Sequence, residues 1–182
     1  MGMAAPLFHT AEMVRGLPDD GLRYETVHGE LLMTPAPRAW HQIVLARLSL
    51  ALGRYLERHP VGQILWSPAD ISWGPDTLVQ PDVFVVPWEE VRPLAWDRIK
   101  HLLFVAEVLS ASTARADRFT KRRLYQEVGI PAYWIVDADL QAVEVWTPGA
   151  AFPAIEDARV EWLPPGAPEP FVVSLPELFR PL

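Results

Sequence analysis

The sequence has no cysteine and no asparagine, and only two of its 182 residues, Lys100 and Lys121, are lysines. Without cysteine the chain can form no disulfide, no thiolate nucleophile and no Cys-ligated zinc or iron–sulfur site. It also lacks a run of about 18 apolar residues, so we expect no membrane-spanning helix. Residues 1–10 lack a charged segment followed by an apolar one. We therefore expect no signal peptide and a cytoplasmic protein.

Positive charge is also in deficit, since 16 lysines and arginines stand against 23 acidic residues and give a formal net charge of −7. This balance excludes a wholly basic, histone-like nucleic-acid binder, but it does not exclude a local basic face. The chain uses 14 arginines and two lysines, so each lysine is a candidate for a special role. Scarce thermolabile residues with 19 prolines are typical of thermophilic proteins, and few lysines are equally typical of a GC-rich genome.

What is present indicates a folded chain, because 50% of the residues are hydrophobic and 21% are charged. Such a composition excludes intrinsic disorder. No internal repeat or long linker divides the sequence. We therefore expect one domain over residues 1–182, with a core at about 17–146 and a Pro-rich C-terminal extension at 147–182.

Hydrophobic periodicity predicts two longer helices among many short strands. Residues 40–58 place apolar side chains at three-to-four spacing, and residues 115–128 form a second helix closed by Gly129 and Pro131. Strands are expected at 23–27, 30–34, 63–66, 70–73, 78–86, 102–109, 132–137, 142–146, 160–163 and 171–173, and short helices at 10–17 and 176–179. This order predicts an α/β (α+β) fold with a mixed central sheet flanked by helices.

Two acidic residues interrupt strongly apolar strands: Glu107 in the run 102–109 and Asp82 in the run 78–86. A buried, unpaired carboxylate is costly, so each needs a basic side chain, backbone donors or a metal ion. Consecutive strands are often neighbours, and the two side chains could then converge on a hard cation such as Mg²⁺ or Mn²⁺. Two separate salt bridges at strand ends are the alternative.

Lys121 lies on the predicted helix that follows Glu107, on one face with Asp117 and Tyr125. The segment 115–123 carries five basic residues against one aspartate, a local charge of +4. A solvated basic face is the simple interpretation. The retained lysine and the start of the helix at the end of the Glu107 strand favour a function, because an ammonium is a compact charge whose pKa can be lowered.

Aspartate, glutamate and lysine together are typical of metal-dependent phosphodiester hydrolysis. The metal binds a phosphate oxygen and lowers the pKa of its water, while lysine orients or activates that water or stabilises the developing charge. The local basic face could bind phosphates of the nucleic-acid backbone.

Several short motifs lie within residues 17–146. They are Tyr24-Glu25 with Gly29-Glu30-Leu31, Pro35-Ala36-Pro37 with His41, Gln80-Pro81-Asp82, Glu107-Val108-Leu109-Ser110, Asp117-Arg118, Lys121-Arg122 with Tyr125, and Gly129-Ile130-Pro131 through Tyr133-Trp134 to Asp137. In combination they resemble the Uma family of restriction-endonuclease-like bacterial proteins, which is similar to the PD-(D/E)XK nuclease superfamily. The resemblance implies a mixed sheet flanked by helices, with Mg²⁺ or Mn²⁺ at Asp82, Glu107 and the backbone carbonyl of Val108.

The superfamily pattern has a lysine two residues after the acid, where this sequence has Leu109. The resemblance implies that Lys121 on the following helix supplies the amine instead. Glu30 and His41 are further catalytic candidates. Glu30 is either a third acid at the metal or an exposed hairpin residue, and His41 either binds a phosphate or water or is structural.

Three functions compete. The first is a Mg²⁺-dependent endonuclease that cuts DNA as a homodimer, as many enzymes of the superfamily do. The second is a catalytically degenerate nuclease-fold module that binds nucleic acid or a protein partner, favoured by Leu109 and the net charge of −7. The third is a structural or regulatory protein with a functional acidic surface. Mn²⁺ binding that Asp82→Ala abolishes would favour the enzyme over the module.

Overall fold

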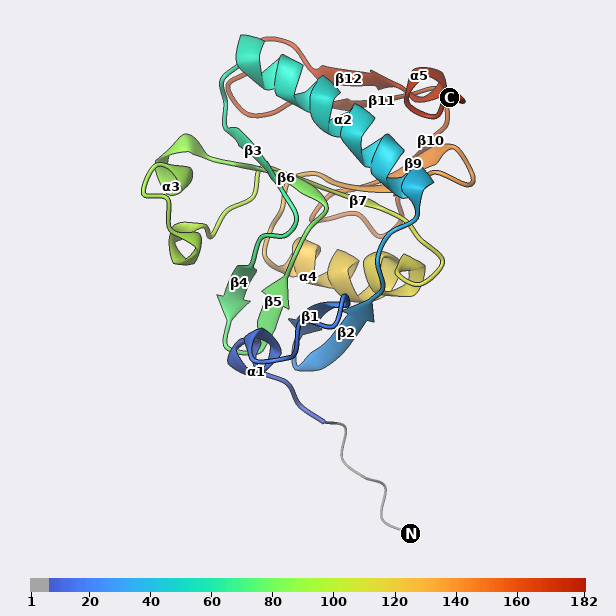
Figure 1. Ribbon diagram of the computed structural model, residues 1–182. Coiled ribbons are helices and arrows are strands. Elements are labelled where there is room, and N and C mark those ends of the chain that lie inside the picture. The colour runs from blue at the N-terminus through green and yellow to red at the C-terminus, as the bar shows by residue number, and fades with distance from the viewer. Residues whose placement is uncertain (1–6) are drawn as a thin grey trace.

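The computed structural model describes residues 7–182, and its centre is a six-stranded mixed sheet of order β10-β9-β8-β7-β6-β3 (Figure 1). The neighbours β7 (Phe104–Val108) and β8 (Tyr133–Asp137) run parallel. The remaining neighbours are antiparallel and involve β3 (Gln63–Trp66), β6 (Val83–Val86), β9 (Ala142–Trp146) and β10 (Ala154–Glu156). Every residue of β6 and β7 is buried, as their apolar sequences predict for strands covered on both faces.

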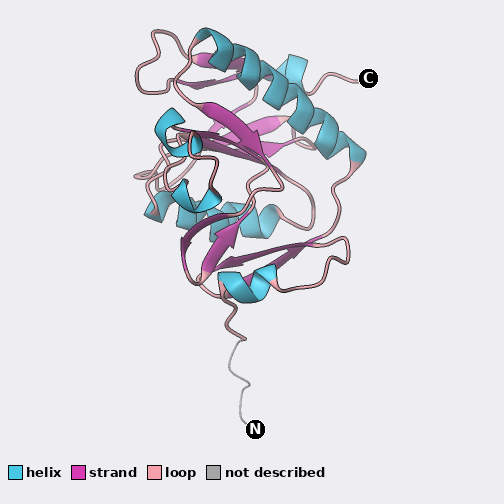
Figure 2. Cartoon of the chain, turned by 60° about the vertical axis from the view of Figure 1, so that its left-hand side comes forward, coloured by secondary structure: helices cyan, strands magenta, loops and turns pink. Residues whose placement is uncertain are grey.

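Two smaller sheets complete the α+β architecture (Figure 2). One has the order β2-β1-β5-β4, with β1 at Arg23–Val27, β2 at Glu30–Thr34, β4 at Ile71–Gly74 and β5 at Thr77–Val79. The other pairs β11 (Arg159–Trp162) with β12 (Phe171–Ser174). The predicted hairpin between β1 and β2 forms because His28 and Gly29 both adopt positive φ, at 50° and 81°.

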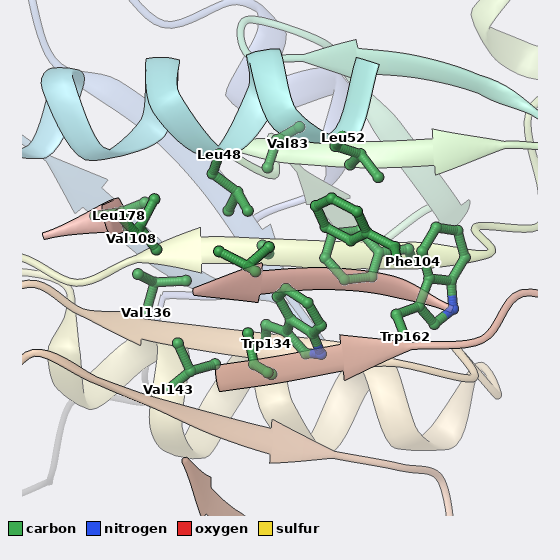
Figure 3. Packing of buried hydrophobic residues seen from close by; sticks show 14 of the residues in the cluster. Leu48, Leu52, Val83, Phe104, Val108, Trp134, Val136, Val143, Trp162 and Leu178 are labelled. Carbon is green, nitrogen blue, oxygen red and sulfur yellow. The ribbon is translucent and has the colours of Figure 1, made fainter. Parts of the chain in front are cut away.

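Helices cover both faces of the central sheet (Figure 1). The long helix α2 (Ala39–Arg58) packs on one face, and α4 (Arg122–Glu127) lies across the other, between this sheet and the four-stranded one. Leu48 and Leu52 of α2 point toward Val83 and Phe104 of the sheet (Figure 3). The short helices are α1 (Ala11–Arg15), α3 (Trp88–Val91) and α5 (Leu175–Leu178), with a 3₁₀ turn at Trp96–Arg98.

The C-terminal extension packs onto α2 rather than projecting from the core. Trp162 and Phe171 are buried with Trp134 and Phe104 of the central sheet. Tyr55 of α2 donates its hydroxyl to the backbone carbonyl of Glu169 at 2.6 Å. Residues 147–182 therefore contribute to one of the two main hydrophobic clusters.

Tyr55→Phe is expected to lower the free energy of unfolding by about 1 kcal/mol, because it removes this hydrogen bond and keeps the buried ring. Tyr24→Phe is the matched control, since the Tyr24 hydroxyl bonds an exposed Asp20 and its loss should cost less than about 0.5 kcal/mol. Urea unfolding followed by circular dichroism measures both. Equal stability of Tyr55→Phe and the unmodified chain would contradict this anchoring role.

Two predicted elements differ from the structure. The single strand expected at 78–86 is two strands in different sheets, because Pro81 has no N–H for a ladder and the chain leaves β5 at Gln80. The helix expected at 115–128 begins as a π-helical segment, Ala116–Lys121, before α4. Sequence periodicity also missed α3, the 3₁₀ turn and β10, which are all four residues or shorter.

None of the helices in residues 7–182 has the length and apolarity that a membrane span requires. The expectation about a signal peptide concerns residues 1–10, of which 1–6 lie outside the described residues.

Candidate active site

Asp82 and Glu107 meet where β6 and β7 run side by side. Val83 lies opposite Ala106 in this antiparallel pair, so the next positions are Asp82 and Glu107. The Asp82 amide donates to Glu107 Oε2 at 3.2 Å, and the Val108 amide donates to Asp82 Oδ2 at 2.9 Å. Both carboxylates are buried. The structure thus brings together the two acids that the sequence predicts to converge.

Lys121 binds Glu107 and lies beside two further buried carboxylates, Glu25 and Asp117. Its Nζ lies 3.0 Å from Glu107 Oε1, 2.9 Å from Glu25 Oε1 and 3.6 Å from Asp117 Oδ1. The side chain is fully buried, and Tyr125 donates its hydroxyl to Glu107 Oε1 at 3.1 Å. A solvated basic face is therefore the wrong interpretation for Lys121.

Two other arginines of the predicted basic face make contacts outside this cluster. Arg118 pairs with Asp137 at 2.9 Å and with Glu144 at 2.5 Å, and Arg122 stacks over the Trp146 ring. Within residues 115–123, Lys121 is the basic residue that lies among the buried carboxylates of Glu25, Glu107 and Asp117.

Arg23 and His41 flank Asp82 on its open side. Arg23 Nη1 lies 3.0 Å from Asp82 Oδ1, and His41 Nε2 lies 3.2 Å from Asp82 Oδ2. His41 is buried at the N-terminal turn of α2, whereas the Arg23 side chain is 21% exposed. The structure therefore places the candidate His41 against a carboxylate oxygen.

Glu30 does not join this cluster, and Glu25 does. Glu30 is exposed at the start of β2, whereas Glu25 is buried in β1 and binds Lys121. Sequence reasoning missed Glu25 and Arg23, although β alternation places both on one face of β1. Two charged residues on one face of this short strand are the sequence signal that could have identified them.

The cluster carries more negative than positive charge. Four carboxylates (Glu25, Asp82, Glu107 and Asp117) surround Arg23 and Lys121, a net charge of −2 when all four carboxylates are ionised and His41 is neutral.

The pKa values follow from this burial and charge. Burial raises the pKa of Glu107 to about 8 in spite of Lys121, and it raises the pKa of Asp117 to about 6. Burial also acts to raise the pKa of Asp82, but the hydrogen bond from His41 and the charge of Arg23 hold it below its ordinary value.

Lys121 is held as an ammonium ion. Burial would lower its pKa, but the charges of Glu107, Glu25 and Asp117 raise the pKa above its ordinary value. The sequence argument that its pKa can be lowered is therefore wrong for this arrangement. Lys121 can position a carboxylate or stabilise negative charge, and it does not accept a proton in this state.

The donor set fits a hard divalent cation in kind and in charge. Mg²⁺ is typically bound by one or two carboxylates with water and substrate oxygens, and a divalent ion would balance the charge of the cluster when all four of its carboxylates are ionised. Glu25 Oε2 is buried without a hydrogen-bond partner. Within residues 7–182, no three acidic or histidine side chains already form a metal cage. At Val108 the amide contacts Asp82, and its carbonyl as a ligand stays a prediction.

A pocket of about 670 Å³ opens directly onto Asp82. Its walls come from β1, the loop after β2, the N-terminal turns of α2, and the segments around Trp66 and Ser110. Arg23, His41 and Asp82 line it, whereas Glu107 and Lys121 lie beneath the lining. The buried cluster therefore borders this pocket through Arg23, His41 and Asp82.

The α+β fold of this chain is also found in a solved structure. A crystal structure titled as a putative nuclease belonging to DUF820, from Anabaena variabilis, matches this chain with a TM-score of 0.76 and 20% identity. The match covers 94% of this chain and 97% of that one. The mixed sheet flanked by helices that the sequence predicts is thereby confirmed.

The chain belongs to the Uma2 family, described as "Putative restriction endonuclease", whose model matches residues 11–176. This result confirms the resemblance carried by the sequence motifs. It also extends the family region beyond 17–146, into most of the C-terminal extension. No curated protein matches the chain.

Proposed function

We propose that the protein is a divalent-metal-dependent nuclease that hydrolyses phosphodiester bonds in DNA. The observation that carries the proposal is the buried cluster in which Lys121 binds Glu107 and Glu107 contacts Asp82, at the floor of an open pocket. Membership of the Uma2 family supports it. A cytoplasmic location and a homodimer stay predictions.

Asp82 and Glu107 would hold Mg²⁺ or Mn²⁺. Such an ion polarises a phosphate oxygen and lowers the pKa of bound water. Lys121 holds Glu107 by a charge-assisted bond of 3.0 Å, and His41 fixes Asp82 from the other side. Arg23 lines the pocket with a guanidinium suited to bidentate contact with a phosphate.

A catalytically degenerate nuclease-fold module is the second candidate, favoured by Leu109 where the superfamily has lysine. Arg23 and Lys121 also satisfy carboxylate oxygens without a metal ion. Against this candidate stands the position of the Lys121 ammonium, which contacts Glu107 from the neighbouring helix as the resemblance implies.

Purified protein with supercoiled, linear and single-stranded DNA separates the two candidates. We expect cleavage with Mg²⁺ or Mn²⁺ that EDTA abolishes. Cleavage that persists in both Glu107→Ala and Lys121→Ala would refute the assignment to this site. Mn²⁺ calorimetry with no binding heat, together with no cleavage of any DNA, would favour the non-catalytic module.

His41→Ala is expected to reduce cleavage and Mn²⁺ affinity by roughly 10- to 100-fold, the range for residues that orient metal ligands. The physical reason is its 3.2 Å contact with Asp82 Oδ2, which fixes that carboxylate. His101→Ala is the control, because His101 is exposed and pairs with Glu90. If both variants retain full activity, His41 does not position Asp82.

A further inference from the structure

The pocket beside Asp82 has room for a whole nucleotide as well as a phosphodiester. Its volume of about 670 Å³ lies within the range of roughly 300–1,000 Å³ that is typical of sites enclosing a small molecule. One wall is the loop Thr34 to Pro37, and another is the start of α2 with Gln42 and Leu45. A nucleic-acid backbone that only crosses the protein surface would leave this pocket empty.

Trp66 offers an uncovered aromatic ring at the mouth of this pocket. It ends β3 opposite Val83, one residue from Asp82, and is 59% exposed although it lines the pocket. The indole nitrogens of Trp73 and Trp88 donate to backbone carbonyls at 2.7 and 3.0 Å. Among residues 7–182, the Trp66 indole has no such hydrogen bond.

Polar groups in the lining complement that ring. Gln42 is an exposed residue next to His41, and its carboxamide can donate to and accept from the edge of a base. Asp70, an acid in the lining, is already bound by Arg15 at 3.2 Å and by Gln80 at 2.9 Å. The lining therefore combines a stacking surface, a free amide and a guanidinium beside Asp82.

We propose that this pocket binds an unpaired nucleotide, with its base stacked on Trp66 and its phosphate bound by Arg23 beside the divalent ion that Asp82 would hold. The proposal rests on the proposed nuclease function and narrows its substrate to single-stranded or frayed nucleic acid. Stacking on an aromatic side chain accepts any base, because every base has a π face. A base within an intact duplex must first be unpaired and unstacked, which disfavours duplex substrates.

Binding is measured with three DNA probes of one sequence: a single strand, a blunt duplex and a duplex with a single-stranded end. Each carries a 2-aminopurine, whose fluorescence is quenched by stacking, and Ca²⁺ replaces Mg²⁺ because it takes the same oxygen ligands. We expect quenching and at least about 10-fold tighter binding for the two probes with unpaired bases. Trp66→Ala should weaken this binding by about 5- to 150-fold.

Trp66→Phe, which keeps an aromatic ring, should retain most of the affinity. Trp96→Ala is the matched control, since Trp96 is also exposed, at 48%, and lies outside the pocket. Unchanged binding by Trp66→Ala, or a blunt duplex bound as tightly as the single strand, overturns the proposal. If the protein cleaves duplex DNA and Trp66→Ala does not change that cleavage, the proposed nucleotide pocket is refuted and the nuclease function is retained. If 2-aminopurine is quenched by stacking but no DNA is cleaved in Mg²⁺ or Mn²⁺, the nuclease function is refuted and the nucleotide pocket is retained.

Discussion

Lys121→Met is expected to abolish cleavage and to lower the free energy of unfolding by about 3–5 kcal/mol, the cost of removing one partner from a buried ion pair. The variant keeps the aliphatic volume of lysine but leaves Glu25, Glu107 and Asp117 facing one another without the central ammonium. Like charges at such distances in a dry environment repel strongly. Urea unfolding in EDTA measures the stability, and DNA cleavage at a temperature where the variant is folded measures the activity.

Lys100→Met is the control that the chain itself provides, because Lys100 is the other lysine and is exposed. We expect it to change stability by less than about 0.5 kcal/mol and to leave cleavage unchanged. Divalent cation should restore part of the stability of Lys121→Met, since a positive ion again balances the carboxylates. A Lys121→Met protein as stable as the unmodified chain would contradict the buried position of this ammonium.

The central part of the site was predictable because its residues are unusual for their positions in the sequence. Glu107 within an apolar strand and Asp82 beside another are costly unless partnered, and strand order then places them together. Lys121 is informative for the same reason, as a lysine in a chain that otherwise uses arginine. Such conflicts between local preference and position are expected at functional sites.

The strand pattern could place Arg23 and Glu25 on one face of β1, but it could not show that this face packs on the site, because that depends on how separate elements dock. Glu25 and Glu30 lie in the two strands of one hairpin, and only the packing of β1 against the helix that carries Lys121 buries the first and not the second. The π-helical segment contains both Asp117 and Lys121. Hydrophobic periodicity does not reveal such a wide turn, although π-helical turns are frequent at functional sites.

Glu107→Gln separates the catalytic role of this carboxylate from a structural one. Burial raises the pKa of Glu107 to about 8, so the neutral amide resembles the protonated carboxyl that the metal-free cluster favours, and it can still accept a bond from Lys121 or Tyr125. We therefore expect metal-free stability to change by no more than about 1 kcal/mol. Cleavage should fall on the order of 1,000-fold or more, because an ion that polarises the phosphate contributes several kcal/mol. Asp82→Asn should do the same to cleavage.

Calorimetric titration with Mn²⁺ checks the cause of that loss, since both variants should bind the ion far more weakly than the unmodified chain. Glu144→Gln is the matched control: it removes a partly buried carboxylate that pairs with Arg118, outside the cluster. It should cost stability and leave Mn²⁺ binding and cleavage intact. If Glu107→Gln instead unfolds the protein and Mn²⁺ binds as before, the carboxylate serves the fold. The metal must then be held by other residues, because a ligand cannot be removed without loss of affinity.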